Sequence, residues 1–215
     1  MLELLTGPVR SILCLGAHCD DIEIGAGATI LGFVADHPGM RVDWVVFSST
    51  PTRAAEARAC AGEFLGKAAS ANVHIHEFRD GFFPSEIRAL KERFEALKAD
   101  VSPDVVFTHY RDDRHQDHRI VSDLTWNTFR DHLVIEYEVP KYDGDLGQPN
   151  LFVPIDETRR RAKIDAILRL YHSQRDKTWF TADTFNGLMR IRGVECRSRT
   201  GYAEAFYARK VVLAR

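Results

Sequence analysis

The stretch that decides the fold is ILCLGAHCDDIE, residues 12–23, in which an apolar run ends in a histidine, a cysteine and neighbouring acidic residues. The run is continuous rather than alternating, which is typical of a strand buried on both faces of a parallel sheet. Asp20 and Asp21 are adjacent like charges that repel each other, so something at the strand end must compensate. A cation, a catalytic task and a solvated turn are the three candidate explanations.

Strand-like and helix-like segments alternate along the chain. Strands are expected at 11–17, 42–48, 72–78, 103–109 and 133–140, and helices at 28–39, 53–66, 86–100, 118–132 and near 156–171. This alternation predicts an α/β fold, a Rossmann-like three-layer sandwich with a mostly parallel sheet. No repeat or linker interrupts it, so residues 1–215 are expected to form a single domain. About the last 60 residues are harder to place and are expected to add an edge strand or a hairpin.

Composition excludes several classes of protein. The net charge of -2 at pH 7 leaves no overall basic field that would attract nucleic acid. The four cysteines form no CxxC pair and are interpreted as reduced thiols of a cytoplasmic protein. Residues 1–10 do not have the pattern of a signal peptide, and no apolar run reaches the roughly 18 residues of a membrane helix. A cytoplasmic protein without a membrane span is therefore expected.

Two polar clusters each follow a strand that is expected to be buried. The first is HCDDIE (18–23) and the second is HYRDDRHQDHR (109–119). The second cluster contains His109, His115 and His118. The carboxyl ends of strands border the ligand crevice of such a sheet, so the two clusters are expected to meet. His18, Asp21 and one of these histidines would form a three-ligand site with an open position for water, as in catalytic zinc sites. Asp20 would then lie beside the bound water as a general base.

Each of these features also has a purely structural interpretation. A histidine at a strand end is often a hydrogen-bonded turn residue, and an Asp-Asp pair is often a helix N-cap. RDDRHQDHR could be a salt-bridged surface loop, since Arg and Asp alternate in it. The combination of two clusters at two strand ends favours the metal site. Residues 25–32 do not complete GxGxxG, and the sequence contains no GxxxxGK[ST], GxSxG or HExxH.

Five segments follow the motif order of a known family. GAHCDDIE (16–23) and HQDH (115–118) resemble the AHPDDE and HPDH motifs of the PIG-L/LmbE-like superfamily of zinc-dependent N-deacetylases, of the N-acetylglucosaminyl deacetylase type. Residues 53–66 resemble its R-x-x-E…LG helix, residues 163–174 its K…SQ helix, and residues 202–206 its AEAF segment. The resemblance covers nearly the whole chain, and its first two motifs are the specific ones.

By position, the resemblance implies a site with one zinc ion per chain. The implied zinc ligands are His18, Asp21 and His118. Asp20 would be the general base. His115 would polarise the substrate carbonyl or stabilise the oxyanion, and Asp117 would orient or charge His115. Arg53 occupies the position of a substrate-contacting arginine.

Two residues depart from the family motifs. Cys19 and Gln116 each stand where the motif has a proline. Neither proline binds metal, so the chemistry is expected to survive. The rigidity of the turns is the property that these changes affect, because proline fixes φ and removes a hydrogen-bond donor. Cys19 also lies near the expected metal, where its thiol could be oxidised or could become a ligand.

The resulting expectation is a hydrolase that removes the acetyl group from a small-molecule amino-sugar conjugate containing N-acetylglucosamine. Loops 79–85 and 141–150 are candidates for the rim, and Arg111 and Arg114 could favour an anionic group or pair with the neighbouring aspartates. A metal-dependent phosphoesterase is one alternative, although it normally uses two metals. A catalytically silent sugar-binding protein is the other. The sequence is compatible with a homo-oligomer.

Overall fold

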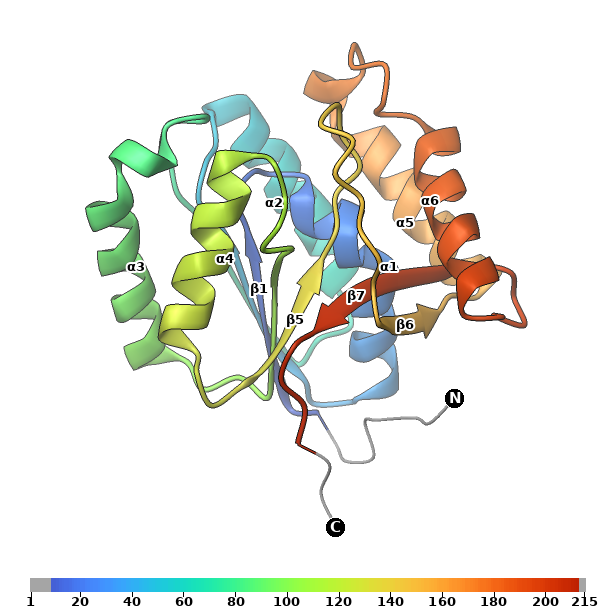
Figure 1. Ribbon diagram of the computed structural model, residues 1–215, viewed down its shortest axis with the longest axis horizontal. Helices are drawn as coiled ribbons and strands as arrows, with labels where there is room; N and C mark the ends of the chain where they lie inside the picture. Colours follow the sequence, from blue (N-terminus) through green and yellow to red (C-terminus); the bar gives the residue numbers. More distant parts are fainter. Residues whose placement is uncertain (1–8, 213–215) are drawn as a thin grey trace.

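One seven-stranded sheet organises the molecule (Figure 1). The fold comes from a computed structural model that describes residues 9–212. The expectation that residues 1–10 are not a signal peptide falls mostly on residues 1–8, which lie outside the described residues. The strands are β1 (Ser11–Gly16), β2 (Arg41–Val46), β3 (Ser70–Ile75), β4 (Val105–His109), β5 (Leu133–Tyr137), β6 (Leu151–Pro154) and β7 (Ala203–Ala208). Their order is β3-β2-β1-β4-β5-β7-β6. The first five are parallel, and β7 is antiparallel to β5 and β6. The predicted mostly parallel α/β fold is confirmed.

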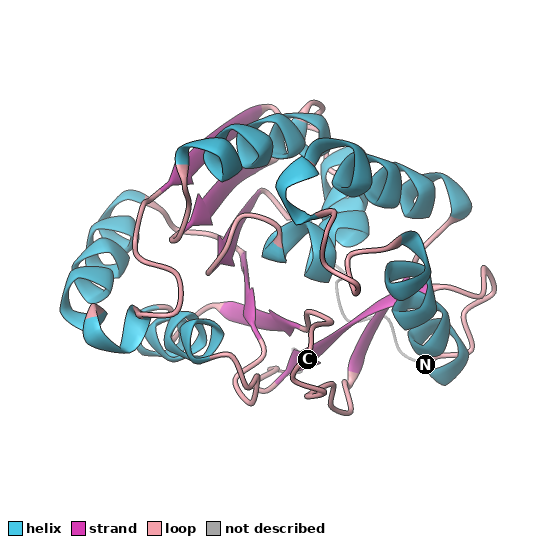
Figure 2. Ribbon diagram, turned by 90° about the horizontal axis from the view of Figure 1, so that it is seen from above, coloured by secondary structure: helices cyan, strands magenta, loops and turns pink. Residues whose placement is uncertain are grey.

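Helices cover both faces of the sheet (Figure 2). They are α1 (Asp21–Asp36), α2 (Pro51–Leu65), α3 (Ile87–Asp100), α4 (Gln116–Thr128), α5 (Glu157–Leu170) and α6 (Ala182–Glu195), with short 3-10 turns at Phe83–Ser85 and His172–Gln174. Side chains of β1 alternate between two cores: Ile12 and Cys14 pack with α1, α2, α5 and α6, whereas Leu13 and Leu15 pack with α3 and α4. None of the helices in residues 9–212 is long and apolar enough to cross a membrane.

Helix α1 begins seven residues before the position expected from the sequence. Residues 28–39 were expected to be helical, whereas α1 starts at Asp21, inside the first polar cluster. Gly25 and Gly27 weaken the helix pattern, because glycine is a poor helix former. The structure uses both for close packing: a Cβ at Gly25 would overlap the ring of Tyr137, and one at Gly27 would overlap Phe64. The early start places Asp21 in the first helical turn.

The C-terminal residues complete the sheet and support α1. The edge strand that the sequence suggested is β6, but β7 lies inside the sheet, and α6 was not predicted. Glu204 of β7 accepts hydrogen bonds from the backbone N–H groups of Ala28 and Thr29 at 2.9 and 2.7 Å. Lys163 of α5 donates to Glu204 at 2.7 Å and to the carbonyl of Ile24 at 2.6 Å. This buried ion pair therefore fixes the middle of α1 to the C-terminal segment.

Candidate metal centre and active site

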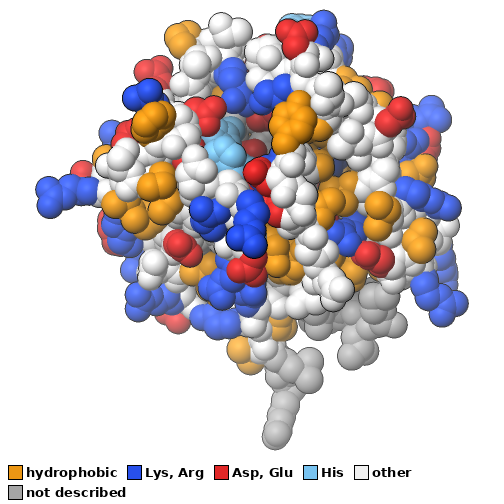
Figure 3. Space-filling model, turned by 45° about the horizontal axis from the view of Figure 1, so that its top comes forward, with side chains coloured by type: hydrophobic (Ala, Val, Ile, Leu, Met, Phe, Trp, Pro, Cys, Tyr) orange, Lys and Arg blue, Asp and Glu red, His pale blue; other side chains and the backbone are white. Residues whose placement is uncertain are grey.

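The two polar clusters meet at the carboxyl ends of β1 and β4. These strands are neighbours in the sheet, although β4 follows β1 by three further strands along the chain. The connections leave β1 and β4 in opposite directions across the sheet, which makes their ends a topological switch point, the usual ligand position in such folds. Figure 3 shows histidine side chains inside a hollow of the surface, with acidic and basic groups around it.

The turn between β1 and α1 holds His18 and Asp21 in a fixed relation. The backbone N–H of His18 donates to Oδ2 of Asp21 at 2.6 Å, and both side chains are buried. Asp20 occupies the N-cap position of α1, yet its side chain makes no capping hydrogen bond to the described residues. The purely structural interpretation of the Asp-Asp pair therefore does not account for Asp20.

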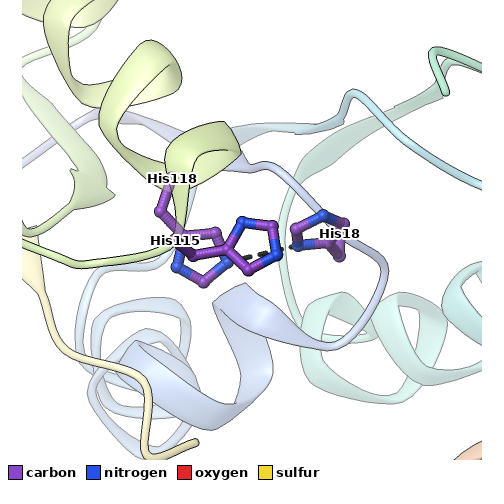
Figure 4. Close-up of side chains that lie close together, drawn as sticks. All are labelled: His18, His115 and His118. Atoms are coloured by element: carbon purple, nitrogen blue, oxygen red, sulfur yellow. Dashed lines mark hydrogen bonds between the residues drawn. The ribbon is translucent and has the colours of Figure 1, made fainter. Parts of the chain in front are cut away.

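Three donor atoms from the two clusters form a tight triangle, called the inner donor set below: Nδ1 of His18, Oδ2 of Asp21 and Nε2 of His118. The two histidine nitrogens are 3.2 Å apart (Figure 4). Their distances to Oδ2 of Asp21 are 3.3 Å from His18 and 3.5 Å from His118. Tetrahedral zinc with bonds of about 2.0–2.1 Å requires ligand atoms about 3.4 Å apart. The residues therefore fit a zinc ion that leaves a fourth position open.

His118 is held by residues that the sequence did not single out. Its Nδ1 lies 2.9 Å from Oδ2 of Asp113. An ionised carboxylate only accepts hydrogen bonds, so Asp113 keeps the proton of His118 on Nδ1 and leaves the Nε2 lone pair free. Lys141 donates to the same Asp113 oxygen at 2.9 Å and to Asp145 at 2.5 Å. Asp113 is thus a buried positioning residue rather than part of the salt-bridged surface loop considered above.

Electrostatics around the inner donor set favour a cation. Burial, together with His109, lowers the pKa of His118 to about 4, so its imidazole is neutral at pH 7. Burial also opposes the charge of Asp21, but the surrounding histidines outweigh it and hold the pKa of that carboxyl well below its usual range. For His18, burial is outweighed by the carboxylates of Asp21, Asp117 and Asp80, which raise its pKa. These carboxylates stabilise positive charge in the centre of the site.

His109 is the remaining histidine of the second cluster. It is fully buried, and its Nε2 accepts from the backbone N–H of Ala17 at 2.9 Å and lies 3.2 Å from Oδ2 of Asp21. Its ring stacks on that of His118 with centroids 3.9 Å apart. Donor atoms of Asp21, His109 and His118 also lie within 4.8 Å of one another. His109 therefore lies against two members of the inner donor set, Asp21 and the ring of His118.

Asp20 forms an ion pair with Arg53, which comes from the first turn of α2. Nη2 of Arg53 lies 2.5 Å from Oδ1 of Asp20. On the same helix, Glu56 accepts from the backbone N–H of Ser173 at 2.9 Å and from its hydroxyl at 2.6 Å. The resemblance assigned Arg53 to the substrate; in the structure its partner is the carboxylate expected to be the general base.

His115 and Asp117 lie at the start of α4, on the outer side of His18. Nδ1 of His115 accepts from the backbone N–H of Asp117 at 3.3 Å. The Asp117 carboxylate has other partners than the resemblance implied: it accepts from the N–H groups of Gly81 and Phe83 at 2.6 and 3.2 Å and lies 3.3 Å from Nε2 of His18. Burial and the nearby charge of His18 lower the pKa of His115. Neutral His115 therefore carries its proton on Nε2.

Asp80, in the loop after β3, is a site residue that the sequence analysis did not name. Its Oδ1 lies 3.1 Å from Nε2 of His18, while 63% of the side chain is exposed. The hydrogen bond from His18 lowers the pKa of Asp80 to about 2. The signal that could have found it is its position, because loop 79–85 follows a strand whose carboxyl end borders the same crevice.

The two departures from the family motifs make hydrogen bonds that a proline could not make. The buried thiol of Cys19 donates to the carbonyl of Ser48 at 3.5 Å, away from the inner donor set, and burial raises its pKa to about 12. Nε2 of Gln116 donates to the carbonyl of Gly81 at 3.1 Å. Cys19 is therefore a turn residue tied to the neighbouring β2–α2 loop, and Gln116 ties α4 to loop 79–85.

Similar solved structures share this fold at low sequence identity. The N,N'-diacetylchitobiose deacetylase of Pyrococcus horikoshii aligns with a TM-score of 0.70 and 19% identity, over 94% of this chain and 84% of that chain. The zinc inhibited form of teicoplanin deacetylase Orf2 aligns with a TM-score of 0.71 and 15% identity, over 92% and 97%. GalB, the 4-carboxy-2-hydroxymuconate hydratase from Pseudomonas putida KT2440, aligns with a TM-score of 0.72 and 16% identity, over 96% and 98%.

Family membership rests on the sequence. No curated protein matches the chain closely enough to count as a relative. Residues 13–129, more than half of the chain, match the PIG-L family, described as GlcNAc-PI de-N-acetylase. The matched segment contains both polar clusters and all members of the inner donor set. The protein that carries this site is a member of the PIG-L family.

Proposed function

We propose that the protein is a zinc-dependent N-deacetylase that hydrolyses the acetamide of an N-acetylated amino sugar. The observation that carries this proposal is the inner donor set of His18, Asp21 and His118, with Asp20 next to it in the chain. Membership of the PIG-L family and the similarity to two deacetylases support the reaction type. The hydratase on the same fold means that the fold alone does not select this chemistry.

In this proposal the chain holds one ion through His18, Asp21 and His118. Zinc, when bound, supplies Lewis acidity for the substrate carbonyl and lowers the pKa of a coordinated water. Asp20 accepts the proton of the attacking water and later delivers it to the departing amine nitrogen. Asp20 is free for this task because Asp21, not Asp20, belongs to the inner donor set.

His115 supplies a hydrogen-bond donor for the oxygen that becomes negative during the attack. Its Nδ1 is occupied as an acceptor from the N–H of Asp117, so the proton on Nε2 can be donated to the substrate. Removing one donor of this kind typically costs about 3–4 kcal/mol of transition-state stabilisation. Arg53 holds the Asp20 carboxylate in one orientation until substrate arrives.

The substrate class proposed is a GlcNAc-containing conjugate. Two aromatic side chains on the candidate rim loops are exposed, Phe82 at 43% and Tyr142 at 71%, whereas Phe83 of loop 79–85 is buried. Phe82 and Tyr142 are therefore the aromatic residues available for stacking on a sugar face. The guanidinium of Arg79 lies 3.6 Å from the centroid of the Phe82 ring and adds a cation beside that surface.

An acetate-release screen tests the proposal. The zinc-loaded protein is incubated with GlcNAc, UDP-GlcNAc and GlcNAc glycosides, and free acetate and primary amine are measured. We expect equal amounts of acetate and amine from at least one substrate, and no release after chelation of the metal. Phosphate-ester hydrolysis without acetate would support the phosphoesterase alternative, and sugar binding without any turnover would support the silent binding protein.

A further inference from the structure

Residues 171–174, called the support segment below, follow helix α5 and have no part in the mechanism proposed above. Tyr171 is the C-cap of α5, and the 3-10 turn His172–Gln174 comes directly after it. The side chains of Tyr171 and Gln174 are buried, at 0% and 3% exposure. The segment therefore lies inside the molecule, although it is more than 50 positions away from both polar clusters.

Tyr171 holds the backbone of the turn that carries Asp20. Its hydroxyl donates to the carbonyl oxygen of Cys19 and lies 2.6 Å from Oε1 of Glu23. A hydroxyl has one proton and two lone pairs, so it can donate to the carbonyl and accept from Glu23 when that carboxyl is protonated. The Cys19 carbonyl belongs to the peptide group that directly precedes Asp20. A donor on this oxygen therefore fixes the orientation of the backbone from which the Asp20 side chain extends.

Ser173 holds the helix that carries the ion-pair partner of Asp20. Glu56 accepts from the backbone N–H of Ser173 at 2.9 Å and from its hydroxyl at 2.6 Å. Nε2 of Gln174 donates to the same hydroxyl oxygen at 2.9 Å. Glu56 follows Arg53 by three residues in α2, so both side chains lie on the same face of that helix. The helical turn that contains Arg53 is therefore tied to the support segment.

The two contacts converge on a single ion pair. Asp20 and Arg53 are 33 positions apart and come from different elements, the β1–α1 turn and the first turn of α2. Among residues 9–212, the Asp20 side chain makes no capping hydrogen bond, and Nε of Arg53 has no hydrogen-bond partner. The geometry of the pair thus depends on how the turn and α2 are held, and Tyr171 and Ser173 hold one of them each.

We propose that the support segment positions the general base. Tyr171 and Ser173 keep Asp20 and Arg53 in contact, so that the Asp20 carboxylate retains the orientation in which it takes up a proton. Both are positioning residues, because they act on Asp20 through Cys19 and through Glu56. The proposal rests on the deacetylase function and on the role of Asp20 within it.

The metal ligands are held by other contacts. The N–H of His18 donates to Asp21 at 2.6 Å, and His118 is oriented by Asp113 at 2.9 Å. None of these bonds involves the support segment. Loss of the Tyr171 hydroxyl is therefore expected to affect the chemical step while the chain keeps its zinc.

Tyr171→Phe tests this expectation by removing one oxygen atom. The kcat for acetate release should fall by about 10–100-fold, the range for a displaced catalytic group, with KM and bound zinc unchanged. Tyr207→Phe is the matched control, since Tyr207 is a buried tyrosine of β7 that stacks on Tyr110, and it should behave like the wild type. An unchanged kcat in zinc-loaded Tyr171→Phe would overturn the proposal.

A double-mutant cycle separates positioning from a general loosening of the fold. In an Asp20→Ala background, Tyr171→Phe should cause no further loss of kcat, because the group on which it acts is gone. An equal loss in both backgrounds would show that the hydroxyl does not act through Asp20. Ser173→Ala should lower kcat by about fivefold, as expected for one hydrogen bond, and Ser173→Thr should restore it by returning the hydroxyl. The same kcat in both Ser173 variants would contradict the role of Ser173.

A crystal structure of the Tyr171→Phe/Ser173→Ala protein reads the same contact without any assay of activity. We expect the ion pair between Arg53 and Asp20 to be lost, whereas an unchanged pair would overturn the positioning role. If the screen finds no acetate release from any substrate, loss of the pair still supports the positioning contacts. The positioning role and the deacetylase function can therefore fail separately.

Discussion

The inner donor set and the neighbouring group of Asp80, His115 and Asp117, called the outer donor set, are made of the same residue types at the same edge of the sheet, yet they differ in support. His18, Asp21 and His118 are all buried, and each has a further partner that fixes its orientation. In the outer set, Asp117 is fully buried, whereas Asp80 lies largely in solvent. The comparison teaches that the donor types alone do not define a tight site; burial and supporting hydrogen bonds distinguish the two.

The largest expected effect comes from breaking the inner set. His118→Ala removes one of the three proposed ligands, and a third of the roughly 10–16 kcal/mol typical of a tight zinc site corresponds to a loss of affinity on the order of 10²–10⁴-fold. We expect no zinc after dialysis against a weak chelator, and no acetate release. Circular dichroism checks that the variant is folded. Stoichiometric zinc in folded His118→Ala would mean that His109 or His115 is the ligand.

Asp20→Ala separates chemistry from metal binding. Asp20 lies outside both donor sets, so we expect one tightly bound zinc ion per chain as in the wild type. The kcat for acetate release should fall by about 10²–10⁴-fold, the usual contribution of a general base. Steady-state kinetics on the zinc-loaded variant gives the answer. Normal turnover would exclude Asp20 as the base.

Asp113→Asn weakens the inner set without removing a ligand. The amide no longer fixes the His118 proton through a charged acceptor, and Lys141 keeps only Asp145 as its carboxylate partner. Zinc affinity, measured by competition with a fluorescent chelator, should fall by about 10–100-fold. Asp112→Asn is the matched control, since Asp112 precedes Asp113 in the β4–α4 loop and its side chain is 66% exposed. Equal affinities in the two variants would show that Asp113 has no positioning role.

Cys19→Ala should have the smallest effect of the four. The thiol contacts the Ser48 carbonyl and not the donor sets, so zinc stoichiometry and affinity should equal those of the wild type. Loss of one weak buried hydrogen bond should lower the free energy of unfolding by about 1 kcal/mol, as measured in urea. A clear drop in zinc affinity would place the thiol in the metal site.

The sequence predicted the sheet and both polar clusters because these depend on local patterns. Continuous apolar runs mark buried parallel strands, and Asp20 and His115 occur within recognisable motifs. The arrangement of the C-terminal strands and helix was harder to predict from the sequence. β7 pairs with β5 and β6, which are far from it in the sequence. Helix α6 has no strong apolar periodicity from which it could be predicted.

The supporting residues of the site could not be read from spacing. Lys141 reaches Asp113 across 28 positions of the chain. Asp80 contacts His18 only because loop 79–85 folds back over α4. Such contacts arise from tertiary packing, which a single sequence does not encode in any short pattern. Motifs therefore located the donors, and only the fold identified what orients them.

The ion pair between Lys163 and Glu204 sets a limit on how this protein can be recombined. A fragment that ends at residue 129 would retain every residue of both donor sets. It would lack Glu204, and the buried backbone N–H groups of Ala28 and Thr29 would lose that acceptor. Chimaeras with other family members should therefore exchange α1, α5 and β7 as one block, because Asp21, the proposed metal ligand at the start of α1, depends on a strand at the far end of the chain.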